Sequence, residues 1–435
     1  MNEAGYCIVS LCDGHTSVKE IAQLISRQYG ISFDSSCSDV KTFIRQLAQD
    51  GFLSASDPTH RENNLFGKLS PGLRKINLNI TERCNLRCRH CAVTDGREKR
   101  DYLSTEQIFR IIDEAQESGN CFLTLGGGEP LMREDCIKIL SYAAPRVKTG
   151  LNTNATLIDD YLAGVLADLG VSLQISLDGP GEFIHDFIRG KGAFGKTLQA
   201  IDLLIGKGAG KRIAFCVTIS RNNIEYIPDI LALASEKGIS SLRFVPIQAM
   251  GSARVHWDKL ALSTRDYTKF YTYMYQKVPS LFPGFHISPG FHGFLLYFSA
   301  GQTMWCQIGE ILALDAQGWL YPCPLLMEPE FRLGKIQKMS LQQAVESEKM
   351  AEIQEVCRRR KDDISRCRAC AWHHFCQAGC AGTVYQSKGT FHEVDDLCEL
   401  RQKMYPQTIF GLAAEKCSSS GSGHKWENIR ENACN

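Results

Sequence analysis

Three cysteines on one short segment have the spacing of a metal-binding loop. They stand in the run TERCNLRCRHC as Cys84, Cys88 and Cys91. Three thiolates on such a loop can hold three corners of a cubane iron–sulfur cluster and leave the fourth iron open to a small-molecule ligand. A structural zinc loop is the alternative. In a large chain without an export signal, clustered thiols favour metal binding over disulfides.

Seven further cysteines, of 19 in the chain, follow a second pattern near the C-terminus. Cys306 and Cys323 flank Gly318 as Cys-x11-Gly-x4-Cys, and Cys398 comes last. Between them stands Cys-x2-Cys-x5-Cys-x3-Cys, which comprises Cys367, Cys370, Cys376 and Cys380. This set is also rich enough in thiolates for iron–sulfur clusters, and a zinc-only site is again the alternative.

The elements that would position the first cysteine set alternate between short apolar runs and helix-length segments. Six such repeats predict an α/β fold, in which a parallel sheet with right-handed crossovers curls into a partial (β/α)6 TIM-type barrel. The residues after each strand would line one mouth of the barrel, where such folds keep their chemistry. The predicted strands are 76–81, 121–125, 149–153, 172–177, 213–219 and 242–247.

Other segments flank this barrel. Apolar stripes at helical spacing, such as Val18, Ile21 and Ile25, predict a helical N-terminal domain that resembles a winged helix. We expect the C-terminal cysteine-rich part to be loop-like. The expected divisions are an N-terminal helical domain (1–56), a linker (57–73), the barrel (74–250), a connecting helical region (251–305), a cysteine-rich Fe–S domain (306–412) and a mobile tail (413–435).

Charge and hydropathy exclude several classes of partner. The chain of 435 residues has 49 Lys and Arg against 48 Asp and Glu, so no basic excess indicates a nucleic acid or an anionic membrane as a partner. The N-terminus lacks the pattern of a signal peptide, and apolar runs stop short of the ~18 residues that a membrane span needs. We therefore expect a soluble, cytoplasmic protein.

The predicted barrel resembles the radical S-adenosylmethionine (SAM) family. The cysteine loop carries the resemblance together with GGGEP (126–130), NTNAT (152–156), SLDG (176–179) and a following Arg-Gly pair. The resemblance implies a 4Fe-4S cluster whose open iron binds the amino and carboxylate groups of SAM. One electron from the reduced cluster would then cleave SAM into methionine and a 5′-deoxyadenosyl radical.

The resemblance also implies residues that contact SAM. Gly127, Gly128 and Glu129 would meet the methionine amino group, Ser176 and Arg189 the ribose and carboxylate, and Asn154 the ribose. Each has an ordinary alternative. The glycines can form a tight turn, Asn154 can cap a helix, and Arg189 can be a surface charge. His90 departs from the aromatic residue often found in the family, and it can still stack near the adenine.

The C-terminal cysteines resemble the SPASM extension of radical SAM enzymes, many of which modify peptides. The resemblance implies two auxiliary clusters. Cys367, Cys370, Cys376 and Cys398 would hold one completely, whereas Cys306, Cys323 and Cys380 supply only three thiolates for the other. Some relatives have another cysteine shortly after the first of these, and residues 307–314 contain none.

Two interpretations of the missing ligand remain open. Cys357 or another remote residue completes the cluster, or one iron stays open to a substrate thiolate. The basic run from Arg358 to Arg360 would favour a thiolate at Cys357. Its neighbours Ile353 and Val356 instead suggest an ordinary position on an apolar helix face. We expect an open or non-cysteine site.

Residues 2–53 resemble the helical part of the leader-peptide recognition domain typified by the peptide chaperone of pyrroloquinoline-quinone synthesis. Asn2, Leu11, Asp13, Gly14 and the following helix carry this resemblance. The domain of that family begins with a β-hairpin that takes up the leader as an added strand, and this sequence starts after it. We therefore expect weak leader binding, unless a separate peptide chaperone or an upstream start supplies the hairpin. A generic helical domain is the alternative, and no basic recognition helix indicates DNA binding.

Taken together, the resemblances imply modification of a ribosomally made peptide by C–H abstraction and C–C or C–S bond formation. The implied reductant is a flavodoxin- or ferredoxin-type protein. Two alternatives are radical tailoring of a small molecule in haem-type or quinone cofactor synthesis, and a non-catalytic Fe–S electron-transfer or binding protein. No individual catalytic side chain is singled out.

Overall fold

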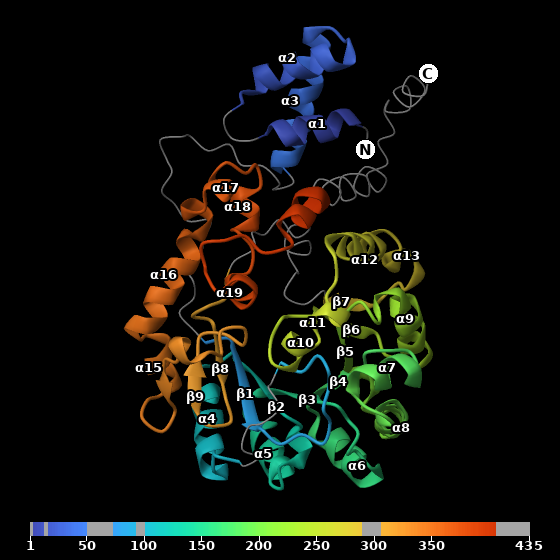
Figure 1. The fold of residues 1–435 in the computed structure, drawn as a ribbon, viewed down its shortest axis with the longest axis vertical. Coiled ribbons are helices and arrows are strands. Elements are labelled where there is room, and N and C mark those ends of the chain that lie inside the picture. The colour runs from blue at the N-terminus through green and yellow to red at the C-terminus, as the bar shows by residue number, and fades with distance from the viewer. Residues whose placement is uncertain (1–2, 13–15, 50–72, 93–100, 289–305, 406–435) are drawn as a thin grey trace.

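The computed structural model describes residues 3–12, 16–49, 73–92, 101–288 and 306–405 (Figure 1). A group of helices at the N-terminus, a ten-stranded sheet with its helices, and a C-terminal group of helices follow one another along the chain. In the view of Figure 1, the C-terminal helices α17, α18 and α19 lie between the N-terminal helices and the sheet. No described helix is long and apolar enough to cross a membrane.

Six parallel strands form the centre of the sheet, and each pairs with the next along the chain. This arrangement confirms the predicted mixed α/β fold with a parallel sheet curled into a partial barrel. The strands also fall on the six predicted segments to within a few residues. They are β1 (Lys75–Thr81), β2 (Phe122–Gly127), β3 (Lys148–Thr153), β4 (Ser172–Ser176), β5 (Ile213–Ile219) and β6 (Ser241–Pro246).

The crossover helices form because their apolar residues repeat at helical spacing and their ends are capped. In α4 (Thr105–Glu117), Ile108, Ile111 and Ile112 are buried on one face, and the Ser104 side chain makes a capping box with Gln107. The helices that follow the other strands are α5 (Cys136–Ala143), α6 (Asp160–Leu169), α7 (Glu182–Arg189), α8 (Ala193–Gly206) and α9 (Ile227–Glu236).

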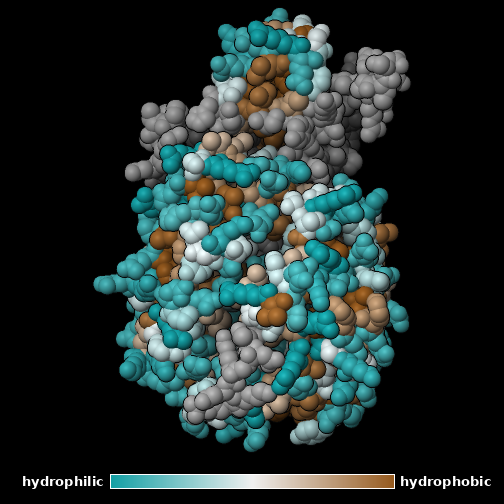
Figure 2. Space-filling view, viewed as in Figure 1, coloured by the Kyte–Doolittle hydropathy of each residue, from teal (hydrophilic) through white to brown (hydrophobic). Residues whose placement is uncertain are grey.

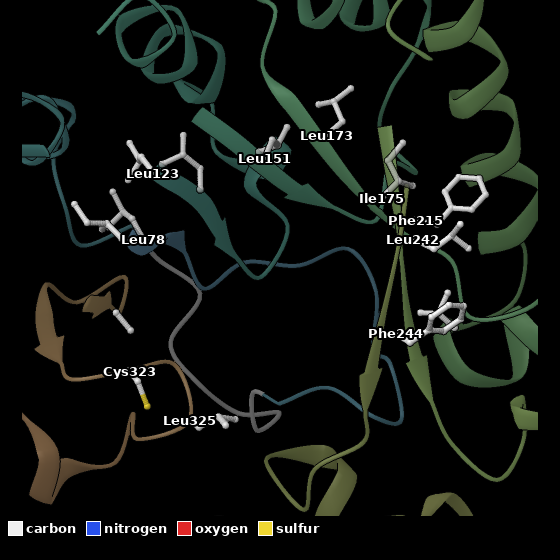
Figure 3. Close-up of a cluster of buried hydrophobic side chains, with 14 of the residues drawn as sticks. Leu78, Leu123, Leu151, Leu173, Ile175, Phe215, Leu242, Phe244, Cys323 and Leu325 are labelled. Atoms are coloured by element: carbon white, nitrogen blue, oxygen red, sulfur yellow. The ribbon is translucent and has the colours of Figure 1, made fainter. Parts of the chain in front are cut away.

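The two faces of the barrel sheet differ in polarity. One face turns apolar side chains such as Leu78, Leu123 and Phe215 into the layer beneath the helices (Figure 3). The alternate residues of the same strands lie on the other face, because successive side chains in a strand point to opposite sides. That inner face is polar and half-buried, and its residues include Asn77, Asn79, Asn152 and Gln174.

Four short strands extend the sheet beyond the six predicted ones. β7 (His286–Ser288) pairs with β6, β8 (Ile311–Leu314) pairs with β1, and β9 (Trp319–Tyr321) and β10 (Gly334–Lys335) continue from β8. Segments of two to four residues are too short to show the alternation by which a strand is predicted. The region expected to be helical between the barrel and the cysteine-rich part thus also contains a strand. Its helices are α10 (Ser252–Val255), α11 (Trp257–Leu260), α12 (Thr264–Gln276) and α13 (Val278–Leu281).

The described N-terminal residues are helical, as α1 (Glu3–Leu11), α2 (Val18–Tyr29) and α3 (Phe33–Gln49). The helix α2 begins at a capping box between Ser17 and Glu20. The three helices share a small core of their own, and Val9 and Leu47 also join the main core of the molecule. On the face shown in Figure 2, polar residues predominate, with an apolar patch on the N-terminal helices.

The C-terminal part is more helical than expected. Its elements are α15 (Leu341–Val345), α16 (Glu348–Asp363), α17 (Ser365–Arg368), α18 (His373–Cys376) and α19 (Ala381–Lys388). The expectation of a loop-like domain was therefore wrong for 341–388, because several of its cysteines lie on helices and not in turns between them. The predicted tail, and the linker apart from residue 73, lie outside the described residues.

Candidate metal centres

The first cysteine set lies on the loop that follows β1, at the mouth of the barrel. Cys84, Cys88 and Cys91 are partly buried free thiols. Burial raises the pKa of Cys84 and raises that of Cys88 to about 12, and the negative charge of the neighbouring Cys91 adds to both increases. Three thiolates this close repel one another, and bound iron would offset that repulsion because it holds coordinating thiols in the deprotonated form.

The loop is fixed to elements that lie far away in the sequence. The Arg89 N–H donates to the carbonyl of Ile188 over 2.9 Å, and its guanidinium lies 4.1 Å from the centre of the Phe187 ring. The carbonyl of Cys91 accepts a hydrogen bond of 2.9 Å from the Ser252 N–H. Contacts with α7 and α10 therefore hold the three cysteines over the barrel mouth.

Asn154, a predicted ribose contact, links this loop to the end of β3. Its amide nitrogen donates to Asn85 Oδ1 over 2.9 Å, and its own Oδ1 accepts from the N–H and the hydroxyl of Thr156. The N-cap of the following helix is Asp159, so the alternative that Asn154 caps this helix was wrong. The contact with SAM remains a prediction, and the observed bonds give Asn154 a structural role in any case.

Glu129 joins the ends of β2 and β3. One carboxylate oxygen accepts from the Thr153 hydroxyl over 2.7 Å and from the Leu131 N–H over 3.2 Å, and the other accepts from the Asn154 N–H over 2.7 Å. The side chain is buried, and this burial raises the pKa of Glu129 despite the three hydrogen bonds. A ligand amino group would meet a carboxylate that these bonds have already oriented.

Gly127 and Gly128 lie against the start of the cysteine loop. The Gly128 N–H donates to the carbonyl of Thr81 over 2.9 Å. A Cβ on Gly127 would collide with the Thr81 carbonyl oxygen, and one on Gly128 with that of Arg83. Both positions therefore require glycine for close backbone packing, whether or not they also contact SAM.

Arg189 lies inside the protein, so the surface-charge alternative was wrong. Its Nε donates to Asp178 Oδ2 over 2.6 Å, and Nη1 lies 4.0 Å from the sulfur of Cys88. Its Nη2 is 3.4 Å from His90 Nε2, which is itself 2.9 Å from the same Asp178 oxygen. Arg189, Asp178 and His90 thus form one buried charged group beside the cysteine loop, and we refer to it as the Asp178 cluster.

Asp178 is the central residue of this cluster, and sequence reasoning did not single it out. Burial disfavours its charged form, but Arg189 and His90 outweigh this effect and hold the pKa of the carboxyl well below its usual range. Asp178 Oδ1 also accepts from the Thr218 N–H over 2.8 Å, and the Asn223 side chain donates to the Asp178 carbonyl over 2.9 Å. Its place in the SLDG motif was the only feature of the sequence that could have pointed to Asp178 as a site residue.

Ser176, the remaining predicted SAM contact, ends β4 and lies half-buried in register with Cys216 of β5. It is on the same sheet edge as the start of the SLDG turn that contains Asp178. Its contact with SAM remains a prediction.

Four of the C-terminal cysteines line one cavity. Burial raises the pKa of Cys367 to about 11, and the negative charges of Cys376 and Cys398 add to this increase. The Gln402 amide donates to the sulfur of Cys370 over 3.8 Å. Four convergent thiols fit a complete cluster, as predicted for this set. The residues that line the cavity include Cys367, Cys370, Cys376, Cys398, Trp372 and Tyr405.

The other C-terminal set contains a residue beyond the three predicted. The thiols of Cys306 and Cys357 share a hydrogen bond. Cys306 and Cys380 are near enough for their charge to raise the pKa of Cys323, together with its burial. The structure thus places Cys357 beside Cys306, from which 50 residues of sequence separate it. The expectation of an open or non-cysteine site stays a prediction.

The spacing of these side chains bears on the zinc alternatives. Among the described residues, no three His, Cys or carboxylate side chains are grouped closely enough to hold a single metal ion.

Comparison with known protein families identifies three parts of the chain. Residues 78–234 match the radical SAM superfamily. Residues 1–53 match coenzyme PQQ synthesis protein D (PqqD), and residues 306–371 match the iron–sulfur cluster-binding domain SPASM. These matches confirm the three resemblances that the sequence motifs indicated.

Two curated relatives cover much of the chain. The mycofactocin maturase MftC of Mycolicibacterium smegmatis is 31% identical over 316 residues, which are 70% of this chain and 77% of the relative. An AdoMet-dependent heme synthase of Methanosarcina barkeri is 27% identical over 354 residues, which are 75% of this chain and 97% of the relative.

Solved structures share the fold at lower identity. Native anSMEcpe with bound AdoMet and the Kp18Cys peptide has a TM-score of 0.65 and 20% identity, over 78% of this chain and 99% of that one. Streptococcus suis SuiB bound to the precursor peptide SuiA has a TM-score of 0.62 and 15% identity, over 85% of this chain and 81% of that one.

The motifs, the barrel and these comparisons agree on the class of protein. SAM, a 4Fe-4S cluster for it and auxiliary iron–sulfur binding in the SPASM part follow from the matched families. The chain therefore belongs to the radical SAM superfamily, as an enzyme that carries a PqqD-like N-terminal segment and a C-terminal SPASM domain.

Proposed function

We propose that this enzyme modifies a ribosomally made peptide by abstracting a hydrogen from it and forming a C–C or C–S bond. The observation that carries the proposal is the combination of a PqqD-like segment with radical SAM and SPASM parts in one chain. The 31% identity with a mycofactocin maturase supports it. The SuiB structure of similar fold has a precursor peptide bound, which agrees with this class of substrate.

Cys84, Cys88 and Cys91 would hold the 4Fe-4S cluster that, when bound, supplies the electron for cleavage of SAM to a 5′-deoxyadenosyl radical. The residues around the cysteine loop would bind SAM and orient it. Arg189 directs N–H donors toward the Cys88 side of the site, and its pairing with Asp178 fixes the plane of the guanidinium. A buried, oriented Arg suits a planar carboxylate such as that of SAM.

The polar inner face of the barrel supports a substrate with many hydrogen-bonding groups. Asn152 of β3 is in register with Gln174 of β4, and Asn79 of β1 is in register with Gly126 of β2. The space above Gly126 is bounded by the side chains of Asn79 and Asn152. Amide side chains offer both donors and acceptors, which suits the backbone of an extended peptide.

A second candidate is radical tailoring of a tetrapyrrole. The observation that favours it is the AdoMet-dependent heme synthase, which this chain matches over 97% of that relative's length. The PqqD-like segment favours the peptide, because residues 1–53 resemble a leader-peptide recognition domain.

The test supplies the reconstituted enzyme with SAM, a flavodoxin or ferredoxin reductant, and short peptides encoded beside its gene. Dithionite replaces the protein reductant in a parallel reaction. We expect one peptide to increase 5′-deoxyadenosine formation and to lose hydrogen by mass spectrometry. Consumption of an iron porphyrin, with no modification of any peptide, would instead establish the tetrapyrrole function.

A further inference from the structure

We infer that Cys357 is the fourth protein ligand of the auxiliary site formed by Cys306, Cys323 and Cys380, so that every iron of this cluster is held by a cysteine. The inference rests on auxiliary cluster binding in the SPASM part, and not on the identity of the substrate. It assigns a ligand where the sequence pattern of this domain leaves a gap.

The position of Cys357 on its helix directs the thiol inward. The buried face of α16 comprises Met350, Ile353, Cys357 and Arg360, at intervals of three and four residues. An ordinary core cysteine on such a face would contact apolar side chains. Cys357 does pack in the main apolar core, and in addition its thiol shares a hydrogen bond with the thiol of Cys306.

The four thiols come from four separate segments. Cys306 lies before β8, Cys323 follows β9, Cys357 lies on α16, and Cys380 is the N-cap of α19. Each is close enough to at least one other for their charges to interact, and Cys306 interacts with all three of the others. Segments so far apart in sequence bring their thiols together only because the fold places them there.

A neighbouring hydrogen bond fixes α16 against the segment of Cys306. The Gln354 amide, one turn before Cys357, donates to the Ile308 carbonyl over 3.0 Å. A Cβ on Gly309, whose φ is 97°, would collide with that amide. The Gln354 side chain therefore packs directly on the segment next to Cys306. This contact fixes where α16, and with it Cys357, lies relative to Cys306.

Arg360 places a positive charge beside the same site. Arg360 is 1% exposed, and its guanidinium donates to the carbonyls of Ala378, Gly379, Phe391 and Glu393 over 2.8 to 3.1 Å. In the described segments no carboxylate forms an ion pair with it. Ala378 and Gly379 directly precede Cys380, so these hydrogen bonds fix α16 against the segment of that cysteine.

A consequence follows for the chemistry of the enzyme. With four cysteines bound, this auxiliary cluster has no iron free to bind a substrate thiolate directly. The cluster then serves to carry electrons, and the substrate must be positioned by side chains and by the SAM site.

The test uses full-length enzyme in which Cys84, Cys88 and Cys91 are all replaced by Ala, so that only auxiliary clusters contribute. Into this background we introduce Cys357→Ala or Cys357→Ser. We expect loss of one to four irons from about eight per chain and a changed electron paramagnetic resonance spectrum of the reduced protein. Iron content and a spectrum equal to those of the background would overturn the inference.

Cys136→Ala is the matched control, because Cys136 is also buried but lies on α5 of the barrel, away from the auxiliary sites. It should leave both the iron content and the spectrum unchanged. A second measurement needs no variant at position 357. Cyanide added to the background protein should leave the spectrum unaltered, whereas a shifted auxiliary signal would reveal an open iron and refute the assignment.

Discussion

At the scale of single residues, the structure concentrates charge around Asp178. Arg189 and Asp178 are both buried, so each is costly without the other. The pair adds no net charge beside the cysteine loop, but it holds the guanidinium in one orientation. A substitution that removes Arg189 entirely would therefore damage both binding and folding, and a conservative change is needed to separate the two effects.

Arg189→Lys provides that change. Lysine keeps the charge that Asp178 requires but loses the planar set of N–H donors. We expect SAM binding to weaken roughly tenfold, which corresponds to about 1.4 kcal/mol, with unchanged iron content. Ser176→Ala is the companion variant, and if Ser176 contacts SAM it should also weaken binding without loss of iron. Isothermal titration and iron analysis measure both quantities, and loss of iron would mean that these residues only support the fold.

His185 gives the Asp178 region a dependence on pH. Burial, followed by the charge of Arg189, lowers the pKa of His185 to about 4 from a reference of 6.5, although Asp178 and Asp186 oppose this shift. The folded protein thus binds fewer protons than the unfolded chain between these values, so stability falls as pH falls from 6.5 toward 4. At pH 5.5 the loss from this group should be about 1 kcal/mol.

His185→Asn tests this dependence, because its Oδ1 can replace His185 Nδ1 as acceptor for the Asp178 N–H. Chemical denaturation at pH 7.5 and pH 5.5 should show a smaller decrease in unfolding free energy for the variant than for the wild type. Equal decreases would show that His185 is protonated in the folded protein.

At the scale of elements, the end of β3 and the cysteine loop behave as one unit. Two hydrogen bonds connect them, from Asn154 to Asn85 and from Asn85 to Thr156, at 2.9 and 2.7 Å. A strand end that is locked into the sheet thereby stabilises a loop that has little secondary structure of its own.

Asn154→Ala and Asn85→Ala should therefore have similar effects. Each removes hydrogen bonds worth about 1 kcal/mol apiece, and each should speed the loss of iron from the SAM-binding cluster to a chelator. Auxiliary iron should be lost at the wild-type rate. If Asn154→Ala alone weakens SAM binding and iron release is unchanged, the ribose contact is the main role of Asn154.

The same elements explain what the sequence can and cannot predict. The six barrel strands are predictable because their apolar runs have strand length and lie between helical patterns. The cysteine sets are predictable because their spacing is local. The hydrogen bond between Cys306 and Cys357 depends on how α16 packs, and the depth of Arg189 depends on its pairing with Asp178. Neither leaves a periodic signal in the sequence.

At the scale of the whole molecule, the sheet connects the two kinds of cluster site. β1 precedes the SAM-site cysteines, and its edge pairs with β8, which begins five residues after Cys306. The register runs from Lys75 opposite Ile311 to Leu78 opposite Leu314. The auxiliary sites are therefore attached to the barrel through backbone hydrogen bonds, which suits electron transfer between them because their separation is fixed.

The most direct test of the account is the formation of 5′-deoxyadenosine from SAM by anaerobically reconstituted enzyme. The intact protein should bind about twelve irons as three clusters and form 5′-deoxyadenosine when reduced. The variant with Cys84, Cys88 and Cys91 replaced by Ala should keep about eight irons and form none. Continued cleavage of SAM by that variant would contradict the assignment of this loop as the radical centre.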